Sequence, residues 1–546
     1  IFDTTRGWDW TQGEGYDATF QYNLPSFHQV GVNPTFDRGK YHDHSDVGHP
    51  MANGFEVRGI GNGTSATGEN GYANGQYNSY NWNRAGIKYL YVAIRRDELS
   101  PTEGRQVYAI SRAKDSHPIV GDNFSIGSPL SLIGHQAATF GSISSTSIHN
   151  DHKVPNLFKP DLVIVNDANI HSSTYNHMRI MTRGWGKYAP STLDARDNRV
   201  QSDLFPYTTF KGTNPFSMSS GFGLTYPQTS QTWNVVNPTN TNYQNSRMYA
   251  HMFKRARGFM DIIHYRGSGT SMTKPHALGV SPEMLIFKMA RFQVFSNYST
   301  GVGNYNSLNT GWEVYHKDMT PAGSGDWTTM KMMFNRGTGT HTSDNNGVGT
   351  YRADDSMTNT STPNYVGDGS ISVGSADDAS GSHFGPGGLS VSSTDITVGG
   401  KTANTGGSDP YYHQCIMFAT LPGVSKVGYY LGTGTSDVNV NCGFSGNARF
   451  ILIKREDDKG PWIVFESGDA HQASTSYYQS NIRTGASDYF TYLNRTDQPA
   501  TQDVIDPFAN GFTVKANSYT NGATQSLPQN GGCPININGA RYIFLA

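Results

Sequence analysis

The chain has 546 residues, too many for one ordinary core, and this length predicts three or four domains. Glycine occurs 62 times, charged residues make up only 15% and aromatic residues 12%; this aromatic content excludes a disordered chain. The net charge of −2 gives no electrostatic reason to expect nucleic acid as a partner, and no apolar run approaches the roughly 20 residues of a membrane-spanning helix. We therefore predict an all-β protein in which Gly, Asn, Ser and Thr form turns and long polar loops.

Two strands are predicted in the first part of the chain, and both recur near its end. Ala-Asn-Gly-Phe-Glu-Val at 52–57 matches Ala-Asn-Gly-Phe-Thr-Val at 509–514. Gly-Ile-Lys-Tyr-Leu-Tyr-Val-Ala at 86–93 matches Gly-Ala-Arg-Tyr-Ile-Phe-Leu-Ala at 539–546. Repetition at this scale predicts copies of one structural unit.

The first copy of this unit begins midway. Ile-Phe-Asp-Thr at 1–4 matches Val-Phe-Glu-Ser at 464–467, so the strands that precede this point in the unit are expected upstream of residue 1. We therefore expect the native polypeptide to continue N-terminally.

The middle of the chain carries weaker copies. The apolar run 162–165 is predicted to pair with 178–181, and Gly221-Phe222 is followed by a predicted strand around 249–253. Each segment is short, rich in β-branched, aromatic or long apolar residues, and bounded by turn-forming residues, as strands are.

The second half gives the full order of the unit. It opens with Tyr-x-Gly-x-Gly-Thr, at 265–270 and 430–435, which we interpret as a tight turn or a close backbone approach. An apolar run ending in Lys follows, then a Trp-led strand that completes a hairpin, then a long polar segment, a Gly-Phe-x-Val strand and a closing aromatic strand. The remaining copies are 284–288 and 450–454 for the apolar run, 312–315 and 462–465 for the Trp-led strand, and Gly388-Leu389 with 415–419 for the last two strands.

This order predicts four domains, at 1–96, 97–256, 257–422 and 423–546. Short strands with turn signals and no helical periodicity predict tandem antiparallel β-sandwiches, jelly-roll or concanavalin-like, with little helix. The run 450–453 is apolar on consecutive residues, which predicts burial on both faces. One face would meet the opposite sheet and the other a neighbouring module or subunit. Three cysteines (Cys415, Cys442 and Cys533) are too few for a disulfide framework in a chain of this length.

The repeated motifs resemble a module found in tail-fibre and other virion structural proteins of marine cyanophages and related phages. The resemblance rests on Tyr-x-Gly-x-Gly-Thr, the apolar run ending in Lys, the Trp-led strand, Ala-Asn-Gly-Phe-x-Val and Arg-Tyr-Ile-Phe-Leu-Ala, and the copies at 423–546 and 1–96 match best. It implies a sandwich in a virion protein and brings no catalytic residues with it.

Several polar clusters in the sequence are candidate sites. His and Asp can ligate a metal, and paired carboxylates can bind Ca²⁺ or hydrolyse a glycosidic bond. No cluster shows the spacing that these sites require, and we interpret the acidic pairs and His clusters as polar loops or turns. Surface Tyr can stack on sugars, but we favour subunit contacts. The clusters are His42-Asp43-His44 with Asp46 and His49, His149 with Asp151 and His152, Asp354-Asp355, Asp377-Asp378, Asp457-Asp458 with Glu466 (which aligns with Asp3), and Tyr298, Tyr305, Tyr477, Tyr478 and Tyr489.

The sequence holds no Gly-x-Ser-x-Gly, no His-Glu-x-x-His and no P-loop. We therefore predict no catalytic, cofactor-binding or metal residues, and a non-enzymatic virion protein located in the virion or outside the cell, most simply a tail-fibre or appendage component for host attachment. Its predicted partners are further copies of itself, as a trimer, and other virion proteins, with no nucleic acid and no membrane insertion. The alternatives are a capsid-surface or filament-forming protein, and a glycan-binding lectin or capsule-degrading glycan hydrolase acting on host-surface glycans.

Overall fold

The structure is a computed structural model, and it describes residues 48–51, 54–57, 88–94, 99–112, 130–132, 160–168, 178–183, 192–194, 222–224, 247–266, 271–290, 313–319, 331–333, 350–351, 389–398, 412–456, 462–466, 482, 488–493, 500–516 and 535–546. Within these residues every strand pair is antiparallel, and the helix whose bounds are fully described is the 3-10 turn η5 (Gly104–Gln106). The all-β prediction is confirmed. A search of the described residues finds no helix with the length and hydropathy that a membrane crossing needs.

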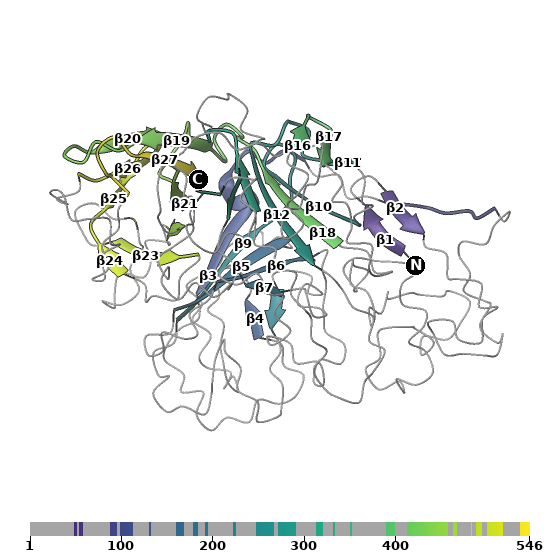
Figure 1. The fold of residues 1–546 in the computed structure, drawn as a ribbon. Coiled ribbons are helices and arrows are strands. Elements are labelled where there is room, and N and C mark those ends of the chain that lie inside the picture. Colours follow the sequence, from purple (N-terminus) through teal and green to yellow (C-terminus); the bar gives the residue numbers. More distant parts are fainter. Residues whose placement is uncertain are drawn as a thin grey trace, which may run out of the picture.

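The C-terminal part of the chain forms a six-stranded sheet facing a three-stranded sheet (Figure 1). The large sheet, here the β19 sheet, places the closing strand second in the order β19-β27-β21-β22-β23-β24. Its strands are β19 (Val427–Leu431), β27 (Arg541–Leu545), β21 (Phe450–Arg455), β22 (Ile463–Glu466), β23 (Asp488–Tyr492) and β24 (Ala500–Gln502). The small sheet has the order β20-β26-β25, from β20 (Val438–Asn441), β26 (Gly511–Val514) and β25 (Ile505–Phe508).

The preceding part of the chain repeats this arrangement. The β10 sheet has the order β10-β18-β12-β13-β14-β15 and faces a small sheet β11-β17-β16. Its strands are β10 (Met260–Arg266), β18 (Tyr412–Phe418), β12 (Met284–Ala290), β13 (Glu313–His316), β14 (Lys331–Met333) and β15 (Thr350–Tyr351), and those of the small sheet are β11 (Met272–Pro275), β17 (Asp395–Val398) and β16 (Leu389–Val391).

A third large sheet, the β3 sheet, comes from residues nearer the N-terminus and has the order β3-β9-β5-β6-β7. The predicted pairing of 162–165 with 178–181 is confirmed, because Val163 lies opposite Met181 in this sheet. The strands are β3 (Tyr108–Arg112), β9 (Arg247–Phe253), β5 (Leu162–Ala168), β6 (Met178–Thr182) and β7 (Thr192–Asp194). Two further two-stranded sheets are formed by β4 (Leu130–Leu132) with β8 (Phe222–Leu224) and by β1 (Gly48–Met51) with β2 (Gly54–Val57).

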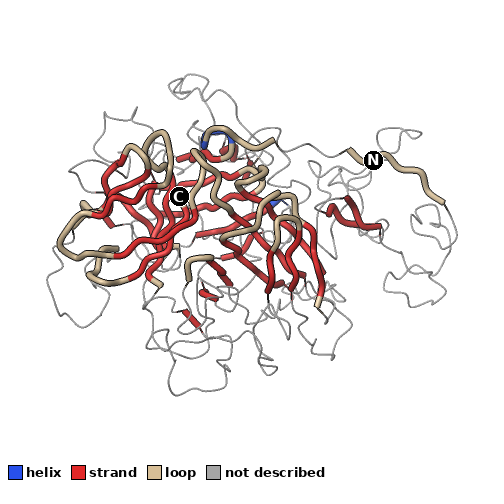
Figure 2. The backbone as a smooth tube through the Cα atoms, turned by 90° about the horizontal axis from the view of Figure 1, so that it is seen from above, coloured by secondary structure: helices blue, strands red, loops and turns tan. Residues whose placement is uncertain are grey.

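The run 450–453 is buried on both faces, as predicted. Ile451 and Ile453 point into the core between the β19 sheet and its small sheet, together with Phe512 and Val514 of β26. Phe450 and Leu452, on the other face, belong to a different core that also contains residues of the two other large sheets. Viewed from above, the strands of the three large sheets gather around the middle of the molecule (Figure 2).

The Tyr-x-Gly-x-Gly-Thr motif is a close backbone approach in its last copy. A Cβ on Gly432 would lie 2.1 Å from the carbonyl oxygen of Ile537, and Gly434 has a φ of +74°. Asn536, which is buried, accepts hydrogen bonds from the backbone N–H groups of Thr433 at 2.7 Å and Gly434 at 3.2 Å. The motif therefore fastens the start of the sandwich to the chain just before its closing strand. Tyr265 of the earlier copy lies in β10 and is buried, and the rest of that motif, 267–270, lies outside the described residues.

We expect Gly432→Ala to destabilise the protein by about 3 kcal/mol or more, because the added methyl meets backbone that side-chain rotation cannot move. Gly446→Ala is the matched control, since no atom lies within 4 Å of the position of its Cβ. Urea unfolding of both variants checks the difference. Equal urea midpoints for the two variants would show that the close approach at Gly432 does not affect stability.

Candidate functional site

The three large sheets pack one face each against a single core, called here the shared core. In each large sheet, the face that lines this core is buried against the other two large sheets. The sequence predicted that one face would meet either a neighbouring module or another subunit, and in this structure a module of the same chain covers it. Its buried members include Val107, Leu162, Ile180 and Phe253 of the β3 sheet and its flank, Met260, Ile262, Met284, Ile286, Val314, Ile416 and Phe418 of the β10 sheet, and Val427, Phe450, Leu452, Trp462, Val464, Ile543 and Leu545 of the β19 sheet.

The sheets contribute to this core at equivalent positions. In each sheet the apolar run pairs on one side with the closing strand and on the other with the third strand of the unit. The registers make the following sets equivalent: Ile164, Ile286 and Leu452 on the apolar runs, Ile180, Val314 and Val464 on the neighbouring strands, and His251, Ile416 and Leu545 on the closing strands.

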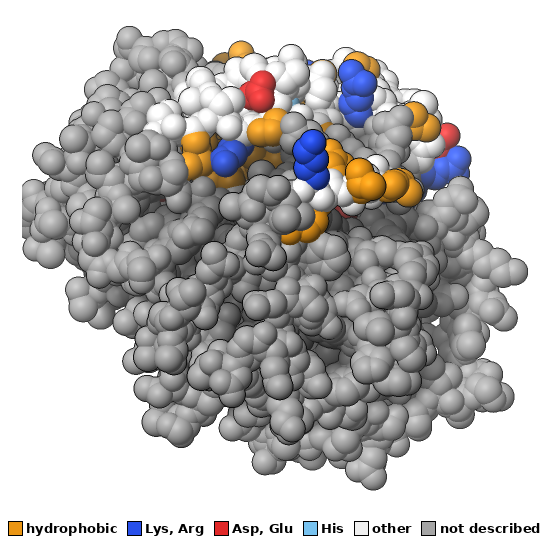
Figure 3. All heavy atoms as spheres, turned by 90° about the vertical axis from the view of Figure 1, so that its right-hand side faces the viewer, with side chains coloured by type: hydrophobic (Ala, Val, Ile, Leu, Met, Phe, Trp, Pro, Cys, Tyr) orange, Lys and Arg blue, Asp and Glu red, His pale blue; other side chains and the backbone are white. Residues whose placement is uncertain are grey.

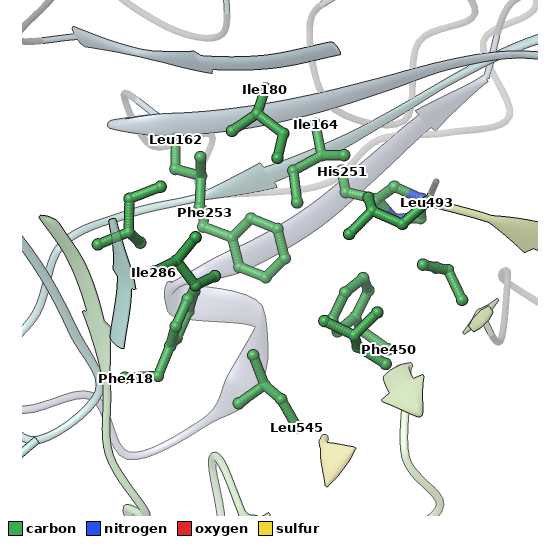
Figure 4. Close-up of a pocket in the computed structure, with 13 residues that line it drawn as sticks. Leu162, Ile164, Ile180, His251, Phe253, Ile286, Phe418, Phe450, Leu493 and Leu545 are labelled. Atoms are coloured by element: carbon green, nitrogen blue, oxygen red, sulfur yellow. The ribbon is translucent and has the colours of Figure 1, made fainter. Parts of the chain in front are cut away.

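Aromatic rings connect the sheets at the centre. The ring of Phe450 lies 5.7 Å from that of Tyr108, 5.4 Å from that of His251 and 5.2 Å from that of Phe253, measured between centroids. Phe253 in turn lies 6.0 Å from Phe418 of the β10 sheet. These edge-on and tilted arrangements are the favourable ones for aromatic pairs. In Figure 4 the side chains of Phe253, Phe418 and Phe450 point toward one another.

A small cavity of about 20 Å³ lies in the shared core, with thirteen residues around it. Twelve of these are Leu, Ile, Val or Phe, and His251 is the one polar residue among them (Figure 4). Nδ1 of His251 lies 3.0 Å from the hydroxyl oxygen of Tyr108. Ligand pockets for small molecules usually measure about 300–1,000 Å³. The cavity has room for about one water-sized sphere and is a packing defect rather than a substrate site.

Buried polar residues occupy a further equivalent position. Thr182, His316 and Glu466 lie opposite the first residue of the apolar run in their respective sheets, which is Leu162, Met284 or Phe450. All three are buried.

Two of these residues connect one large sheet to the next. Thr182 Oγ1 donates to Oε1 of Gln414 in β18, whereas Nε2 of His316 lies 3.2 Å from the carbonyl oxygen of Phe544 in β27. Burial lowers the pKa of His316 to about 3, so the imidazole is neutral and Nε2 donates this bond. Arg541 adds a second link between the β10 and β19 sheets, because its Nη2 donates to the carbonyl oxygen of Asp318 at 2.7 Å.

These polar groups do not form a chemical centre within the described residues, where no group of three or more His, Cys, Asp or Glu side chains is close enough to hold a metal ion. Glu466, the acid aligned with Asp3, is only 4% exposed and faces protein rather than a groove. Cys415 and Cys442 are buried free thiols whose pKa values are raised by burial.

Most candidates from the sequence lie outside the described residues. They are residues 42–46 of the first His cluster, the cluster at 149–152, the acidic pairs at 354–355, 377–378 and 457–458, and Tyr298, Tyr305, Tyr477 and Tyr478. His49 lies in β1, opposite Glu56, and Tyr489 lies in β23, with neither side chain described. Sequence reasoning in turn missed His251, Thr182 and His316. The signal that identifies them is the strand register, which hydrophobic spacing alone does not give.

Residues 355–546 match the model of a family described as a domain of unknown function (DUF7483). The match covers 192 of the 546 residues, from just after β15 to residue 546, which follows the closing strand β27. Comparison of the chain with curated proteins and with solved structures finds no match.

Proposed function

We propose that the chain is a non-enzymatic structural component of a virion, namely a tail-fibre or appendage protein that contacts the host surface. The observation that carries the proposal is the shared core. The β10 and β19 sheets each bury one face against their own small sheet, and all three large sheets bury a face in the shared core. Burial of apolar surface therefore holds three units of one chain together in one body, as a mechanical part requires.

The sequence between the strands supports a surface role. Residues 352–388 separate β15 from β16 and are rich in Gly, Ser, Asn, Asp and Thr. Connecting segments of this length and polarity in compact domains usually carry function, because binding residues are often placed on loops that a rigid scaffold positions. Such segments are suited to contacts with a host surface, with other virion proteins, or with further copies of the chain in the proposed homotrimer.

The described residues give the enzymatic alternative little support. A glycosidase needs two carboxyl groups about 5–10 Å apart in a groove that a sugar can enter. Glu466 is buried, and its predicted partners at 457–458 lie outside the described residues. We therefore keep the structural role as the proposal.

Immunogold electron microscopy tests it. Antibodies raised against the purified chain are applied to intact phage particles from a lysate in which the chain is present, with pre-immune serum as the control. We expect gold on the appendages of the particle. Gold confined to the capsid surface would contradict the appendage assignment and favour the capsid alternative, and label found only on cell debris would contradict a virion role altogether.

A further inference from the structure

The junction between the β10 and β19 sheets contains a buried histidine with both ring nitrogens engaged. His316, at the end of β13, is 1% exposed. Its Nε2 donates to the carbonyl oxygen of Phe544 in β27 at 3.2 Å, and its Nδ1 accepts the backbone N–H of Asp318 at 3.1 Å. This pattern requires a neutral imidazole, because a proton on Nδ1 would point at the N–H group of Asp318.

The second link between the two sheets depends on the same short segment. The carbonyl oxygen of Asp318 accepts a hydrogen bond from Nη2 of Arg541 in β27 at 2.7 Å. The N–H group of Asp318 is held by His316, so the imidazole helps to fix the turn that receives the guanidinium. A proton on Nδ1 would therefore disturb both links at once.

The charges around His316 disfavour a further positive charge there. Lys317 beside it and Arg541 on β27 are cations that lower its pKa, whereas Glu283, just before β12, acts in the opposite direction. The carboxylate of Glu283 already has a cation, since its Oε1 lies 2.7 Å from Nζ of Lys317. Burial has the largest effect and brings the pKa of His316 to about 3.

Three further carboxyl groups near the junction do not offset these effects. Glu456 is paired with Arg541 at 2.8 Å. Glu313 accepts a hydrogen bond from Tyr315, which points into the core of the middle sandwich, on the other face of the sheet from the shared core. Burial raises the pKa of the Asp318 carboxyl group, so this group begins to lose its charge as the medium becomes acidic.

The sandwiches on the two sides of the junction have cores of their own. The core of the last sandwich includes Phe512 and Val514, and that of the middle sandwich includes Tyr265 and Leu285. None of the described members of either core belongs to the shared core. A unit with its own core can stay folded when a contact with its neighbour is lost. Opening of the junction would thus expose apolar surface without unfolding either sandwich.

We propose that acidification opens the junction between the β10 and β19 sheets, with His316 as the group that takes up the proton. The open form presents the apolar side chains of the shared core, while the middle and last sandwiches remain folded. This inference does not depend on the proposed function.

The direction of the effect follows from the two protonation states. In the closed form His316 has a pKa of about 3, and in the open form, where water reaches it, the ordinary value of 6.5 applies. Above pH 6.5 the residue is neutral in both forms and favours neither. As the pH falls from 6.5 toward 3, the open form binds a proton that the closed form excludes. The equilibrium therefore moves toward the open form by up to about tenfold per pH unit.

The test follows the full chain from pH 7 to pH 4 with the dye ANS, which binds exposed apolar surface. Hydrophobic side chains already reach the surface on the face that Figure 3 shows, and Leu90, Val92 and Ile94 are 88% to 103% exposed. The fluorescence at pH 7 is therefore the baseline. We expect the signal to rise several-fold above it between pH 6 and pH 4.

Amide hydrogen exchange, corrected for the effect of pH on the intrinsic rate, shows whether the sandwiches stay folded. β17 and β26 lie in the two small sheets, and their buried side chains belong to the separate cores of the sandwiches. We expect both strands to keep their protection over the pH range in which the dye binds.

His316→Gln removes the titrating group and keeps an amide that can donate to Phe544. In this variant the rise in dye fluorescence should move down by about one pH unit or more. His276→Gln is the matched control. Nδ1 of His276 accepts the N–H of Leu278 at 3.3 Å and its Nε2 lies 3.1 Å from the carbonyl oxygen of Ser392, but these contacts lie within the middle sandwich. This control should keep the acid profile of the parent.

The proposal is overturned if His316→Gln and the parent bind the dye with the same pH dependence, or if His276→Gln shifts the profile as far as His316→Gln does. Loss of protection in β17 and β26 together with dye binding would also overturn it, because the sandwiches would then be unfolding. So would a parent that binds no additional dye above pH 4. If His316→Gln fails to fold at pH 7, His316→Asn replaces it, since the asparagine oxygen can still accept the N–H of Asp318.

Discussion

Replacing Phe450 by alanine is expected to lower the free energy of unfolding by about 3–5 kcal/mol, the usual effect of removing a buried aromatic side chain from a core. Phe450 is 7% exposed and belongs to the β19 sheet, but its ring contacts those of Tyr108, His251 and Phe253 in the β3 sheet. The lost contacts therefore connect residues that lie about two hundred positions apart or more in the sequence. Urea unfolding followed by circular dichroism measures the change.

The same experiment tests whether the large sheets unfold together. A common core predicts one cooperative transition in the parent and, at a lower urea concentration, in Phe450→Ala. Leu431→Ala is the control, because this side chain is 54% exposed and its removal should change stability by no more than about 0.5 kcal/mol. Two well-separated transitions in the parent would show that the sandwiches are independent and that the shared core contributes little.

The second large effect concerns pH. His316 has a folded-state pKa of about 3, because burial disfavours the imidazolium, whereas the ordinary value is 6.5. Above pH 6.5 the residue is neutral in both states, and its contribution to stability is fully present. As the pH falls from 6.5 toward 3, the unfolded chain binds a proton that the folded chain does not. Stability is therefore lost across this window, by about 2 kcal/mol at pH 5 for this residue.

His316→Gln isolates this contribution, since an amide can still donate to the carbonyl oxygen of Phe544 and does not titrate. The stability difference between parent and variant should narrow by about 2 kcal/mol between pH 7 and pH 5. Carboxyl groups also titrate at the lower end of the window, but they are common to both proteins and cancel in the difference. Parallel stability profiles for parent and variant would mean that His316 is not buried as a neutral group.

The individual strands could be predicted from the sequence because each has a local signature. Phe450 to Ile453 are apolar on successive positions, and burial on both faces follows from that pattern alone. The strand order could not be predicted, since the closing strand inserts between the first strand and the apolar run by contacts between residues far apart in the chain. Nor could the sequence decide what covers the second face, because an apolar face is equally suited to a module of the same chain and to another subunit.

The equivalence of the three buried polar residues beside the shared core escaped prediction for a related reason. Thr182, His316 and Glu466 have different chemistry, so no letter-by-letter repeat connects them. Their equivalence depends on the strand registers opposite Leu162, Met284 and Phe450. Asn536 was missed because it stands in a stretch rich in Gly and Asn, where a turn residue and a buried hydrogen-bond acceptor look the same.

The shared core also has an evolutionary consequence. In a symmetric trimer of identical chains, any substitution at the central contact appears three times. A histidine buried there would be present in all three chains. Here the three equivalent closing-strand positions are separate codons of one gene, and they hold His251, Ile416 and Leu545. Each of these positions can therefore be substituted independently of the other two. The segments that connect the strands of the three units can likewise diverge in length and composition. A tandem arrangement of this kind can present three different surfaces where a homotrimer presents one surface three times.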